Sequence, residues 1–428
     1  MDNSKSLPAI WAGMECTISR VGDDFHDQLQ CGSYYDKDYL QPVLDLNVSA
    51  IRFPVLWEKH EPEQGATIDW TWAREQLGRI RHKGIEPIVG LLHHGSGPAF
   101  TSLADKAMPY YFADYAAKVA QAFPWVNYYT PVNEPLTTAR FSGLYGHWYP
   151  HKKSDRHFLN MLINQLKATV LGMQAIRAIN PAAKLIQTED LGKTYSCSTL
   201  QYQSAFENQR RWLSFDLLCG KVDQKHVLYP YLVRNGVAVS DIEFFVQHPC
   251  PPAMIGANYY VTSERYLDCN LDGYPQDTHG GNGIHAYADV EAARVPLTAA
   301  NGPAVLLTEL WERYEIPIAI TEVQLHCSRE EQLRWFKFIH ETALTLQHSG
   351  VDIRAVTAWA VLGSFGWDKL LTCKSMQYES GAFDISAGYC RITALGRLIQ
   401  EIAQTGASQS YGPGPTHQYN GAAFADSW

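Results

Sequence analysis

The chain of 428 residues is 46% hydrophobic and 18% charged, which predicts a large buried core and excludes intrinsic disorder. Its 35 basic and 44 acidic residues give a formal net charge of −9 with no basic run, so we expect no nucleic-acid partner. No stretch approaches the ~18 uninterrupted apolar residues of a membrane span, and no signal-peptide pattern precedes the first predicted strand. We therefore expect a cytoplasmic protein that has no membrane partner.

Short apolar runs alternate with amphipathic stretches along the chain, which is typical of β-α units around a parallel sheet. The eight predicted strands are Ala9–Met14, Ala50–Leu56, Glu86–Leu92, Val126–Val132, Lys184–Thr188, Met254–Tyr260, Ile316–Thr321 and Ile353–Val361. Eight consecutive units fit a closed barrel better than an open sheet. The predicted fold is therefore α/β, a single (β/α)8 TIM barrel with long loops at the carboxyl end of the strands.

The helical patterns lie near Asp36–Leu46, Trp70–Lys83, Pro109–Phe123, Asp155–Ile179, Thr199–Leu218, Ala304–Tyr314, Ser328–His348 and Thr393–Ala403. Two insertions, Cys219–Pro252 and the glycine-rich Thr262–Gly302, interrupt the regular spacing, and loops of this length often build a binding site. After Ala403 the composition changes to glycine, serine, proline and glutamine. We predict a barrel over residues 1–405 and a flexible tail or linker over residues 406–428.

The remaining patterns do not predict a metal or a cofactor. Nine scattered cysteines without a C-x-x-C pair favour reduced thiols. His147 and His151 are four residues apart, but Pro150 between them prevents a regular helix, so a metal site is not favoured. The glycines of residues 280–283 do not connect a strand with a helix, so they are not a dinucleotide fingerprint. Aromatic residues make up 12% of the chain and suit stacking on sugar rings as well as core packing.

Two glutamates follow predicted strands at positions that suit catalysis. The fourth strand leads into Asn133-Glu134-Pro135, and the seventh into Thr321-Glu322. In a ring of eight, strands four and seven lie three steps apart, so their ends face each other at the carboxyl end of the barrel. A facing pair of carboxyl groups is what glycoside hydrolysis requires. For each glutamate taken alone, a solvated strand end or an ion pair is the alternative.

Several motifs occur in an order that resembles a known family. They are Ile51-Arg52-Phe53-Pro54, Leu91-Leu92-His93-His94, Asn133-Glu134-Pro135, Gly256-Ala257-Asn258-Tyr259-Tyr260, Ile320-Thr321-Glu322 and the stretch from Ala358-Trp359 to Phe365-Gly366-Trp367. This series resembles the β-glucosidase-like β-glycosidases of glycoside hydrolase family one. The resemblance covers most of the chain and implies a retaining β-glycoside hydrolase that acts on a β-linked glycoside or a small oligosaccharide and needs no cofactor.

The resemblance also implies roles for individual residues. Glu134 would be the general acid and base, and Glu322 the nucleophile. Arg52 and Tyr260 would orient the nucleophile. The carbohydrate substrate would be bound by His93, Asn133, Tyr260, Trp359, Trp367 and Glu15. Core packing is the alternative for the two tryptophans, and an interior histidine pair is the alternative for His93 and its neighbour. The retaining mechanism requires the two carboxyl groups to be about 5–5.5 Å apart.

The chain departs from the family pattern at the eighth strand. Gly366 occupies the place of a glutamate that grips the outer sugar hydroxyls in glucose- and galactose-cleaving relatives, and Gly363-Ser364 replaces the usual Asp-Asn. On the first strand Glu15 stands near the place of a glutamine. Each lost charge-assisted hydrogen bond is worth roughly 1.5–3 kcal/mol. We therefore expect a non-standard glycone, such as a deoxy sugar or one with an apolar substituent.

Two further expectations follow from the resemblance. A catalytically silent sugar-binding or regulatory module that has kept the barrel is the alternative to an enzyme. The chain also resembles the glycosidase-like front part of bacterial proteins whose rear part is a sugar-nucleotide (dTDP-4-dehydrorhamnose) reductase. A link to such a reductase domain is therefore an expected partner relationship.

Overall fold

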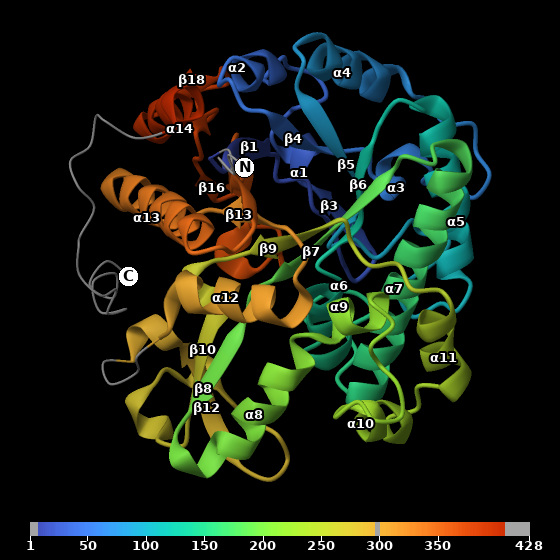
Figure 1. Cartoon of the computed structure of the whole chain (residues 1–428), viewed down its shortest axis with the longest axis vertical. Helices are drawn as coiled ribbons and strands as arrows, with labels where there is room; N and C mark the ends of the chain where they lie inside the picture. Colours follow the sequence, from blue (N-terminus) through green and yellow to red (C-terminus); the bar gives the residue numbers. More distant parts are fainter. Residues whose placement is uncertain (1–6, 296–299, 407–428) are drawn as a thin grey trace.

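A closed barrel of eight parallel strands forms the centre of the molecule in the computed structural model, which describes residues 7–295 and 300–406 (Figure 1). Around the ring the order is β1, β4, β5, β6, β7, β9, β13 and β14, and β14 pairs with β1. The bounds are β1 Ala9–Gly13, β4 Ala50–Pro54, β5 Glu86–His93, β6 Tyr128–Asn133, β7 Lys184–Asp190, β9 Met254–Asn258, β13 Ile318–Val323 and β14 Ile353–Ala358. The predicted TIM barrel is confirmed.

The barrel strands are apolar because the interior and the helix layer bury both of their faces. Every residue of β4 and of β13 is buried. Six strands each contribute one residue to a compact cluster, which consists of Trp11, Ala50, Ile88, Ile186, Ala319 and Ala355. The side chains at the carboxyl ends of the strands are therefore held on a closely packed core.

Helices surround the barrel (Figure 1). They are α2 Leu40–Leu44, α4 Thr71–His82, α5 Met108–Ala122, α7 Asp155–Ile179, α8 Gln201–Arg210, α9 Leu213–Leu218, α12 Gly302–Tyr314, α13 Arg329–His348 and α14 Ala394–Thr405. The helix predicted near Asp36–Leu46 is shorter, because the ring of Pro42 would clash with the carbonyl of Asp38 in a longer helix. The helix predicted over Thr199–Leu218 is divided at Trp212, whose N–H bonds a carbonyl only three residues back.

Shorter helices and strands occur mostly in the segments of the chain that connect the barrel strands with the outer helices. They are β2 Ile18–Val21, β3 Asp24–Asp27, α1 Gln28–Cys31, α3 Trp57–His60, α6 Pro135–Ala139, β15 Ser364–Phe365, β16 Tyr378–Glu379, β17 Phe383–Asp384 and β18 Arg391–Ile392. One π-helical turn, Arg140–Leu144, follows α6 directly. The pair β15 and β16 extends the chain beyond the carboxyl end of β14.

The two insertions are ordered into helices and a sheet. Residues 219–252 contain α10 Tyr229–Arg234 and α11 Val239–Gln247. The second insertion supplies β10 Glu264–Asp268, β11 His279–Gly281 and β12 Ala286–Glu291. These strands form a four-stranded sheet with β8 Lys193–Ser196, in the order β11, β12, β10, β8. Pairing with β8 thus gives regular structure to a segment whose glycine-rich composition predicts a loop.

A disulfide bond in this sheet corrects the expectation of nine reduced thiols. Cys197 follows β8 and Cys269 follows β10, and the parallel register of the two strands brings their ends together. The two Cα atoms are 6.7 Å apart, within the range that a disulfide spans. The spacing of the cysteines carries no signal of this pair because 72 residues separate them. In the described part of the chain the other seven cysteines are free.

No helix among residues 7–295 and 300–406 is both long and apolar enough to cross a bilayer. Of the predicted tail, residues 407–428 lie outside the described residues. The division of the chain at residue 405 and the link to a reductase domain therefore stay predictions.

Candidate active site

The two predicted catalytic glutamates lie at the carboxyl ends of barrel strands. Glu134 directly follows β6 and forms the N-cap of α6, with a left-handed backbone (φ 44°). Glu322 is the penultimate residue of β13. The order β6, β7, β9, β13 places their strands three steps apart, as predicted. Both side chains are buried, with 4% of Glu134 and 2% of Glu322 exposed.

Glu322 is held by two donors, Arg52 from β4 across the barrel and Tyr260 just after the neighbouring strand β9. The Arg52 Nη1 atom of β4 donates to Glu322 Oε1 at 2.8 Å, and the Tyr260 hydroxyl donates to Oε2 at 2.5 Å. Arg52 Nη1 also donates to the backbone carbonyl of Thr321 at 2.8 Å. The guanidinium is therefore held by a main-chain and a side-chain acceptor of two consecutive residues. Both carboxylate oxygens therefore have a partner that favours the ionised form.

Glu134 has a different environment. The Asn258 Nδ2 atom at the end of β9 donates to Glu134 Oε1 at 2.6 Å. His94 Nε2 lies 3.8 Å from Glu134 Oε2. Burial lowers the pKa of His94 to about 3, so this imidazole is neutral at neutral pH and the contact is not an ion pair. Glu134 thus has no cationic partner among the described residues.

The pKa values of the two glutamates follow from these environments. Burial, and then the negative charge of Glu322, raise the pKa of Glu134 well above its usual value. Burial also raises the pKa of Glu322, but the charge of Arg52 and the Tyr260 hydrogen bond offset part of this rise. A proton is therefore favoured on Glu134, whereas Glu322 is the more acidic of the pair.

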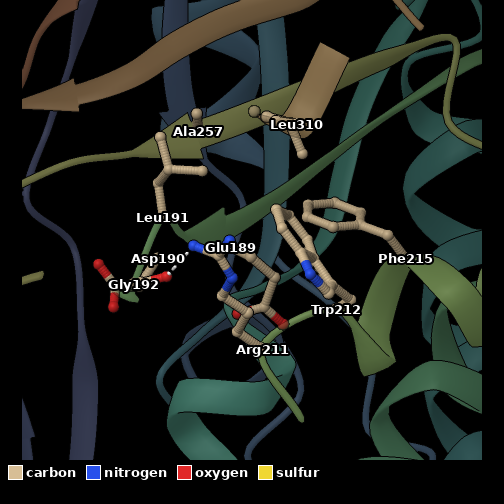
Figure 2. Close-up of a pocket in the computed structure, with 10 residues that line it drawn as sticks. Glu189, Asp190, Leu191, Gly192, Arg211, Trp212, Phe215, Ala257 and Leu310 are labelled. Atoms are coloured by element: carbon tan, nitrogen blue, oxygen red, sulfur yellow. Dashed lines mark hydrogen bonds between the residues drawn. The ribbon is translucent and has the colours of Figure 1, made fainter. Parts of the chain in front are cut away.

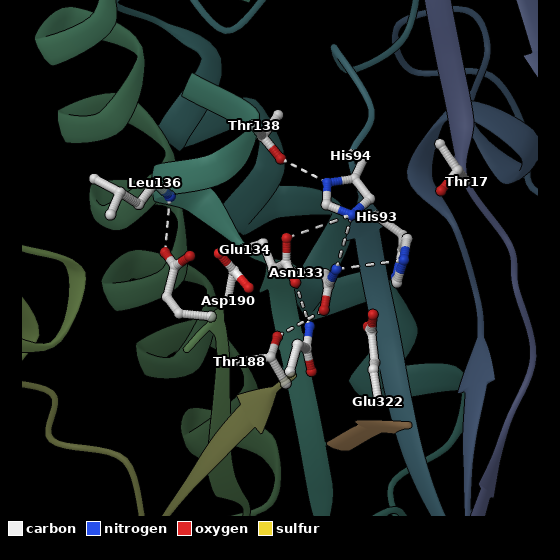
Figure 3. Close-up of polar contacts among 12 residues, drawn as sticks. Thr17, His93, His94, Asn133, Glu134, Leu136, Thr138, Thr188, Asp190 and Glu322 are labelled. Atoms are coloured by element: carbon white, nitrogen blue, oxygen red, sulfur yellow. Dashed lines mark hydrogen bonds and ion pairs between the residues drawn. The ribbon is translucent and has the colours of Figure 1, made fainter. Parts of the chain in front are cut away.

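Asn133 connects the surroundings of both glutamates (Figure 3). Its Oδ1 atom accepts from Arg52 Nη2 and from Thr188 Oγ1, both at 2.7 Å. Its Nδ2 atom lies 3.3 Å from the Nε2 atoms of both His93 and His94. Burial lowers the pKa of His93 well below its usual value, so these ring nitrogens can accept from the amide. The predicted residues Asn133, His93 and Arg52 are therefore brought into one network.

Trp359 lies beside this network and is 4% exposed. Its ring stacks on His93 at a centroid distance of 5.2 Å and an angle of 14°, and the Arg52 guanidinium lies 4.4 Å from its centre. Gly13 of β1 passes so close that a Cβ there would overlap the indole. The absence of a side chain on the first strand therefore makes room for the tryptophan on the eighth.

Trp367 and Glu15 approach the site from its edge. Trp367 meets His94 edge to face at 5.9 Å and Trp148 at 6.3 Å. Glu15 is 4% exposed, and its Oε1 accepts from the Thr17 N–H at 2.9 Å. Burial raises the pKa of Glu15 to about 7, with a smaller contribution from the charge of Glu322. The structure thus gathers every predicted site residue around the carboxyl ends of β1, β4, β5, β6, β9, β13 and β14.

Three residues at the site were not among the predicted ones. Asn258, within a motif recognised in the sequence, is the sole hydrogen-bond donor to the Glu134 carboxyl group among the described residues, and Thr188 fixes Asn133. Asp190 accepts from the Ser263 hydroxyl and adds to the negative charge that raises the pKa of Glu134. Asp190 follows the predicted fifth strand, and that position is itself a signal for the active end of the barrel, with structural pairing as the alternative. The contact of Thr188 with Asn133 joins two strands that are distant in the sequence and has no such signal.

Glu189 has a structural role although it adjoins Asp190. Its Oε1 accepts from the Leu136 N–H at 2.7 Å and from the Ser214 hydroxyl of α9. It lines a small cavity together with Arg211 and Trp212, on the side of β7 that faces the helices (Figure 2). Burial raises the pKa of Glu189 to about 8. A neutral Glu189 therefore satisfies the start of α6, the helix that Glu134 caps.

The histidine pair near the rim does not form a metal site in the structure. His151 Nε2 accepts from the Gly22 N–H at 2.9 Å, and its Nδ1 lies 3.0 Å from the Gly146 carbonyl. His147 packs on Phe141 instead. Both ring nitrogens of His151 are thus engaged in hydrogen bonds with backbone groups.

The comparisons with known proteins concern the family and the fold. The profile described as glycosyl hydrolase family 1 matches residues 8–376. No curated protein matches the chain significantly.

Solved structures of a bacterial enzyme share the fold. The β-glucosidase from Thermotoga maritima in complex with deoxynojirimycin superposes with a TM-score of 0.74 at 17% identity, covering 93% of this chain and 98% of that chain. Its complex with isofagomine lactam gives 0.74 at 17% identity, with 94% and 98% covered. The family 1 β-glucosidase from Thermotoga maritima alone gives 0.73 at 17% identity, with 94% and 99% covered. At this identity the likeness establishes the fold, and the match over residues 8–376 shows that the chain belongs to glycosyl hydrolase family 1.

Proposed function

We propose that the protein is a retaining β-glycoside hydrolase in which Glu134 is the acid and base and Glu322 the nucleophile. The observation that carries the proposal is the difference between their partners. Glu322 receives a guanidinium and a phenol, whereas Glu134 receives one amide and the repulsion of nearby carboxylates. One protonated and one ionised carboxyl group are what a double displacement needs at the start.

In the first step the Glu134 proton passes to the glycosidic oxygen as the bond between that oxygen and the anomeric carbon breaks. A Glu322 oxygen forms a bond to the anomeric carbon, and the aglycone leaves as an alcohol. In the second step the Glu134 carboxylate takes a proton from water, and the resulting oxygen nucleophile displaces Glu322 from the sugar. Both displacements invert the anomeric centre, so the net result is retention.

The surrounding residues have matching roles in this proposal. Arg52 and Tyr260 keep the carboxylate of Glu322 ionised and oriented before the first displacement, and they stabilise it again as it leaves the sugar in the second. His93 donates to a sugar hydroxyl, Asn133 turns one of its two N–H bonds from a histidine to the sugar, and Trp359 offers its face to the sugar ring. Trp367 and Glu15 contact the outer part of the glycone. The network formed by Asn133, His93 and Arg52 holds these groups ready before a substrate arrives.

The glycone is expected to differ from that of common β-glucosidases. The related Thermotoga maritima enzyme is named a β-glucosidase, whereas this chain has no carboxyl group at Gly366. We propose that the substrate is a β-glycoside or a small oligosaccharide whose outer hydroxyls are read by other groups. Simple β-glucosides are then weak substrates.

The test is a panel of nitrophenyl β-glycosides with the configuration of the first-formed sugar followed by NMR. We expect turnover on at least one sugar, a product of retained configuration, and loss of turnover in Glu322→Gln. Inversion would refute the double displacement, and unchanged activity in Glu322→Gln would refute the nucleophile. No turnover on any sugar together with ligand-induced thermal stabilisation would favour the sugar-binding module instead.

A further inference from the structure

The eighth strand leads into a hairpin that carries a downstream glutamate, Glu379. In the antiparallel pair of β15 and β16, Ser364 lies opposite Glu379 and Phe365 opposite Tyr378. Gln28 fastens this hairpin to the N-terminal part of the chain. Its Nε2 donates to the Phe365 carbonyl at 2.7 Å, and its Oε1 accepts from the Phe365 N–H at 3.0 Å. Backbone pairing therefore sets the position of Glu379.

The same hairpin has no room for a side chain at its two glycines. Gly366 has φ 74°, and a Cβ there would lie 2.8 Å from the Ser375 carbonyl oxygen. Gly363 has φ 85°, and a Cβ there would overlap the Glu379 carbonyl oxygen. Residues other than glycine are strained at such φ values. A carboxyl group on this hairpin must therefore come from another position, and Glu379 provides one opposite Ser364.

Glu379 is as closed off as the catalytic pair but has few partners. It is 6% exposed, and the Ser364 hydroxyl bonds to it. Its one ion-pair contact among the described residues is with His326 Nδ1, 3.6 Å from Oε2, on a side chain that is 42% exposed. Burial, together with the charge of Asp368, raises the pKa of Glu379 to about 7. A buried carboxyl group with so few donors is costly unless a ligand supplies more.

Two buried donors in the adjoining segments lack partners in the described part of the chain. Trp367 Nε1, one residue after Gly366, has no hydrogen-bond acceptor. Gln324 Nε2 has none either, and Gln324 is 8% exposed and lies between Glu322 and His326 in the chain. Unpaired buried donors are uncommon in folded proteins. Unpaired donors in two segments connected with Glu379, one just after β15 and one before His326, are independent evidence for a ligand that carries acceptors as well as donors, as a sugar hydroxyl does.

We propose that Glu379 is the glycone-binding carboxyl group of this chain, reaching the sugar across the β15–β16 hairpin in place of the side chain that Gly366 lacks. Glu15, which follows β1, is the second carboxyl group of this glycone site, since its charge acts on Glu379. Trp367 and Gln324 donate to the same hydroxyls. This proposal rests on the proposed function and identifies the specificity-determining residue of its glycone site.

The proposal defines the substrate class more closely than the sequence does. A carboxyl group accepts hydrogen bonds from hydroxyls and is poorly matched to an apolar substituent. The glycone is therefore a sugar that keeps at least one free hydroxyl at the carbons remote from the anomeric centre. This differs from the expectation of an apolar group at that place, which was based on Gly366 alone.

The test compares substrates that differ by one hydroxyl. Nitrophenyl β-glycosides of one parent sugar, gluco- or galacto-configured according to which the wild type cleaves faster, are assayed beside their 4-deoxy and 6-deoxy analogues. In Glu379→Ala we expect kcat/KM to fall about 10- to 100-fold on the parent and by much less on one deoxy analogue, because that analogue never made the lost bond. Glu379→Gln, which keeps an acceptor of similar shape, should lose less.

Two features separate this role from a structural one. A distorted hairpin would lower kcat/KM on all three substrates equally, so equal losses overturn the proposal, as does no loss on the parent. Lys369→Gln is the matched control, since it removes an exposed charge from the same loop and should leave all three rates unchanged.

A binding experiment separates failure of this proposal from failure of the proposed function. If the wild type turns over no glycoside, the calorimetric Kd of deoxynojirimycin and of its 6-deoxy and 4-deoxy counterparts is measured in wild type and in Glu379→Ala. A weakening of about 10-fold or more for the parent, with little change for one deoxy counterpart, would uphold Glu379 in a non-hydrolytic protein. Equal Kd changes for all three ligands would overturn it.

Discussion

The acid pair and the β15–β16 hairpin both present buried carboxyl groups, but their partners differ. Glu322 has a guanidinium and a phenol within hydrogen-bond distance, and Glu134 has an amide. Glu379 has a serine hydroxyl and a half-exposed histidine 3.6 Å away. The carboxyl groups of the acid pair receive hydrogen bonds from protein donors, whereas the carboxyl group of Glu379 can accept more hydrogen bonds than the described residues supply.

This difference indicates which part of the site tolerates few substitutions. The acid pair lies at the ends of barrel strands, and its donors are Arg52 of β4, Asn258 of β9 and Tyr260 just after β9, so that each carboxyl group depends on distant parts of the barrel. The hairpin depends on backbone pairing and on two glycines with positive φ. We infer that the bond-breaking chemistry is fixed by the barrel and that the choice of sugar is set by the hairpin.

The largest expected effect comes from removing the proton donor. Glu134→Ala should lower kcat about 10²- to 10⁴-fold on glycosides with poor leaving groups, because general acid catalysis supplies an effect of this size. With a dinitrophenyl leaving group, which needs no proton, the loss of the bond-breaking step should be much smaller. Pre-steady-state kinetics on the two substrates would measure this. Equal losses on both would contradict the role of Glu134.

Arg52→Lys tests whether the network of the acid pair acts as a unit. Lysine keeps the positive charge but cannot bond Glu322, the Thr321 carbonyl and Asn133 together as the guanidinium does. We expect kcat to fall about 10²- to 10³-fold, the usual effect of losing one preorganised donor. Arg74→Lys, on the outer helix α4, is the matched control. A loss below about threefold in Arg52→Lys would show that charge alone suffices.

Glu15→Gln tests the cost of buried charge at the glycone end. Burial raises the pKa of Glu15 from 4.5 to about 7, so the folded state binds its proton more tightly than the unfolded chain does. The protonated Glu15 therefore adds its whole contribution to the free energy of unfolding below about pH 4.5, and this contribution is lost as the pH rises toward 7. The variant should unfold with a free energy about 3 kcal/mol higher than wild type at pH 8 and show no such gain at pH 4.5.

Denaturant unfolding at the two pH values measures this, and Glu63→Gln, at an exposed position, is the control. A gain of the same size at pH 4.5 would mean that the effect does not come from ionisation.

The smallest expected effect concerns Gly366. Gly366→Glu should not raise cleavage of β-glucosides, because the left-handed backbone and the nearby Ser375 carbonyl oppose the side chain. Gly366→Ala should cost about 1–2 kcal/mol of folding free energy for the same reason. Gly280→Ala, a glycine with open space around it, is the control. An active and stable Gly366→Glu would show that the hairpin can supply the carboxyl group from either strand.

The barrel and the acid pair are predictable from the sequence because their signals are local or periodic. Each strand is a short apolar run, and Glu134 and Glu322 end two of them at a spacing that a ring of eight makes meaningful. The roles proposed for Arg52, Asn133 and Tyr260 are taken from motifs of the resembled family, and the structure brings these residues together around Glu322 and Arg52.

What the sequence does not predict depends on pairing between distant segments. Glu379 is thirteen residues from Gly366 in numbering, and only the register of β15 with β16 places it by Ser364. The disulfide of Cys197 and Cys269 depends in the same way on the pairing of β8 with β10. Neither register is encoded by a periodic pattern, because the strands involved have two to five residues.

The bidentate bond of Gln28 to Phe365 has a consequence for motion. A side-chain amide closes the open edge of β15 as a third strand would, and it links residues 337 positions apart. The Phe365 amide should therefore exchange its hydrogen slowly although it lies beyond the barrel, and its protection should fall in Gln28→Ala. Gln28, near the N-terminus of the chain, would then set the rate at which the β15–β16 hairpin opens locally, although the two are far apart in the sequence.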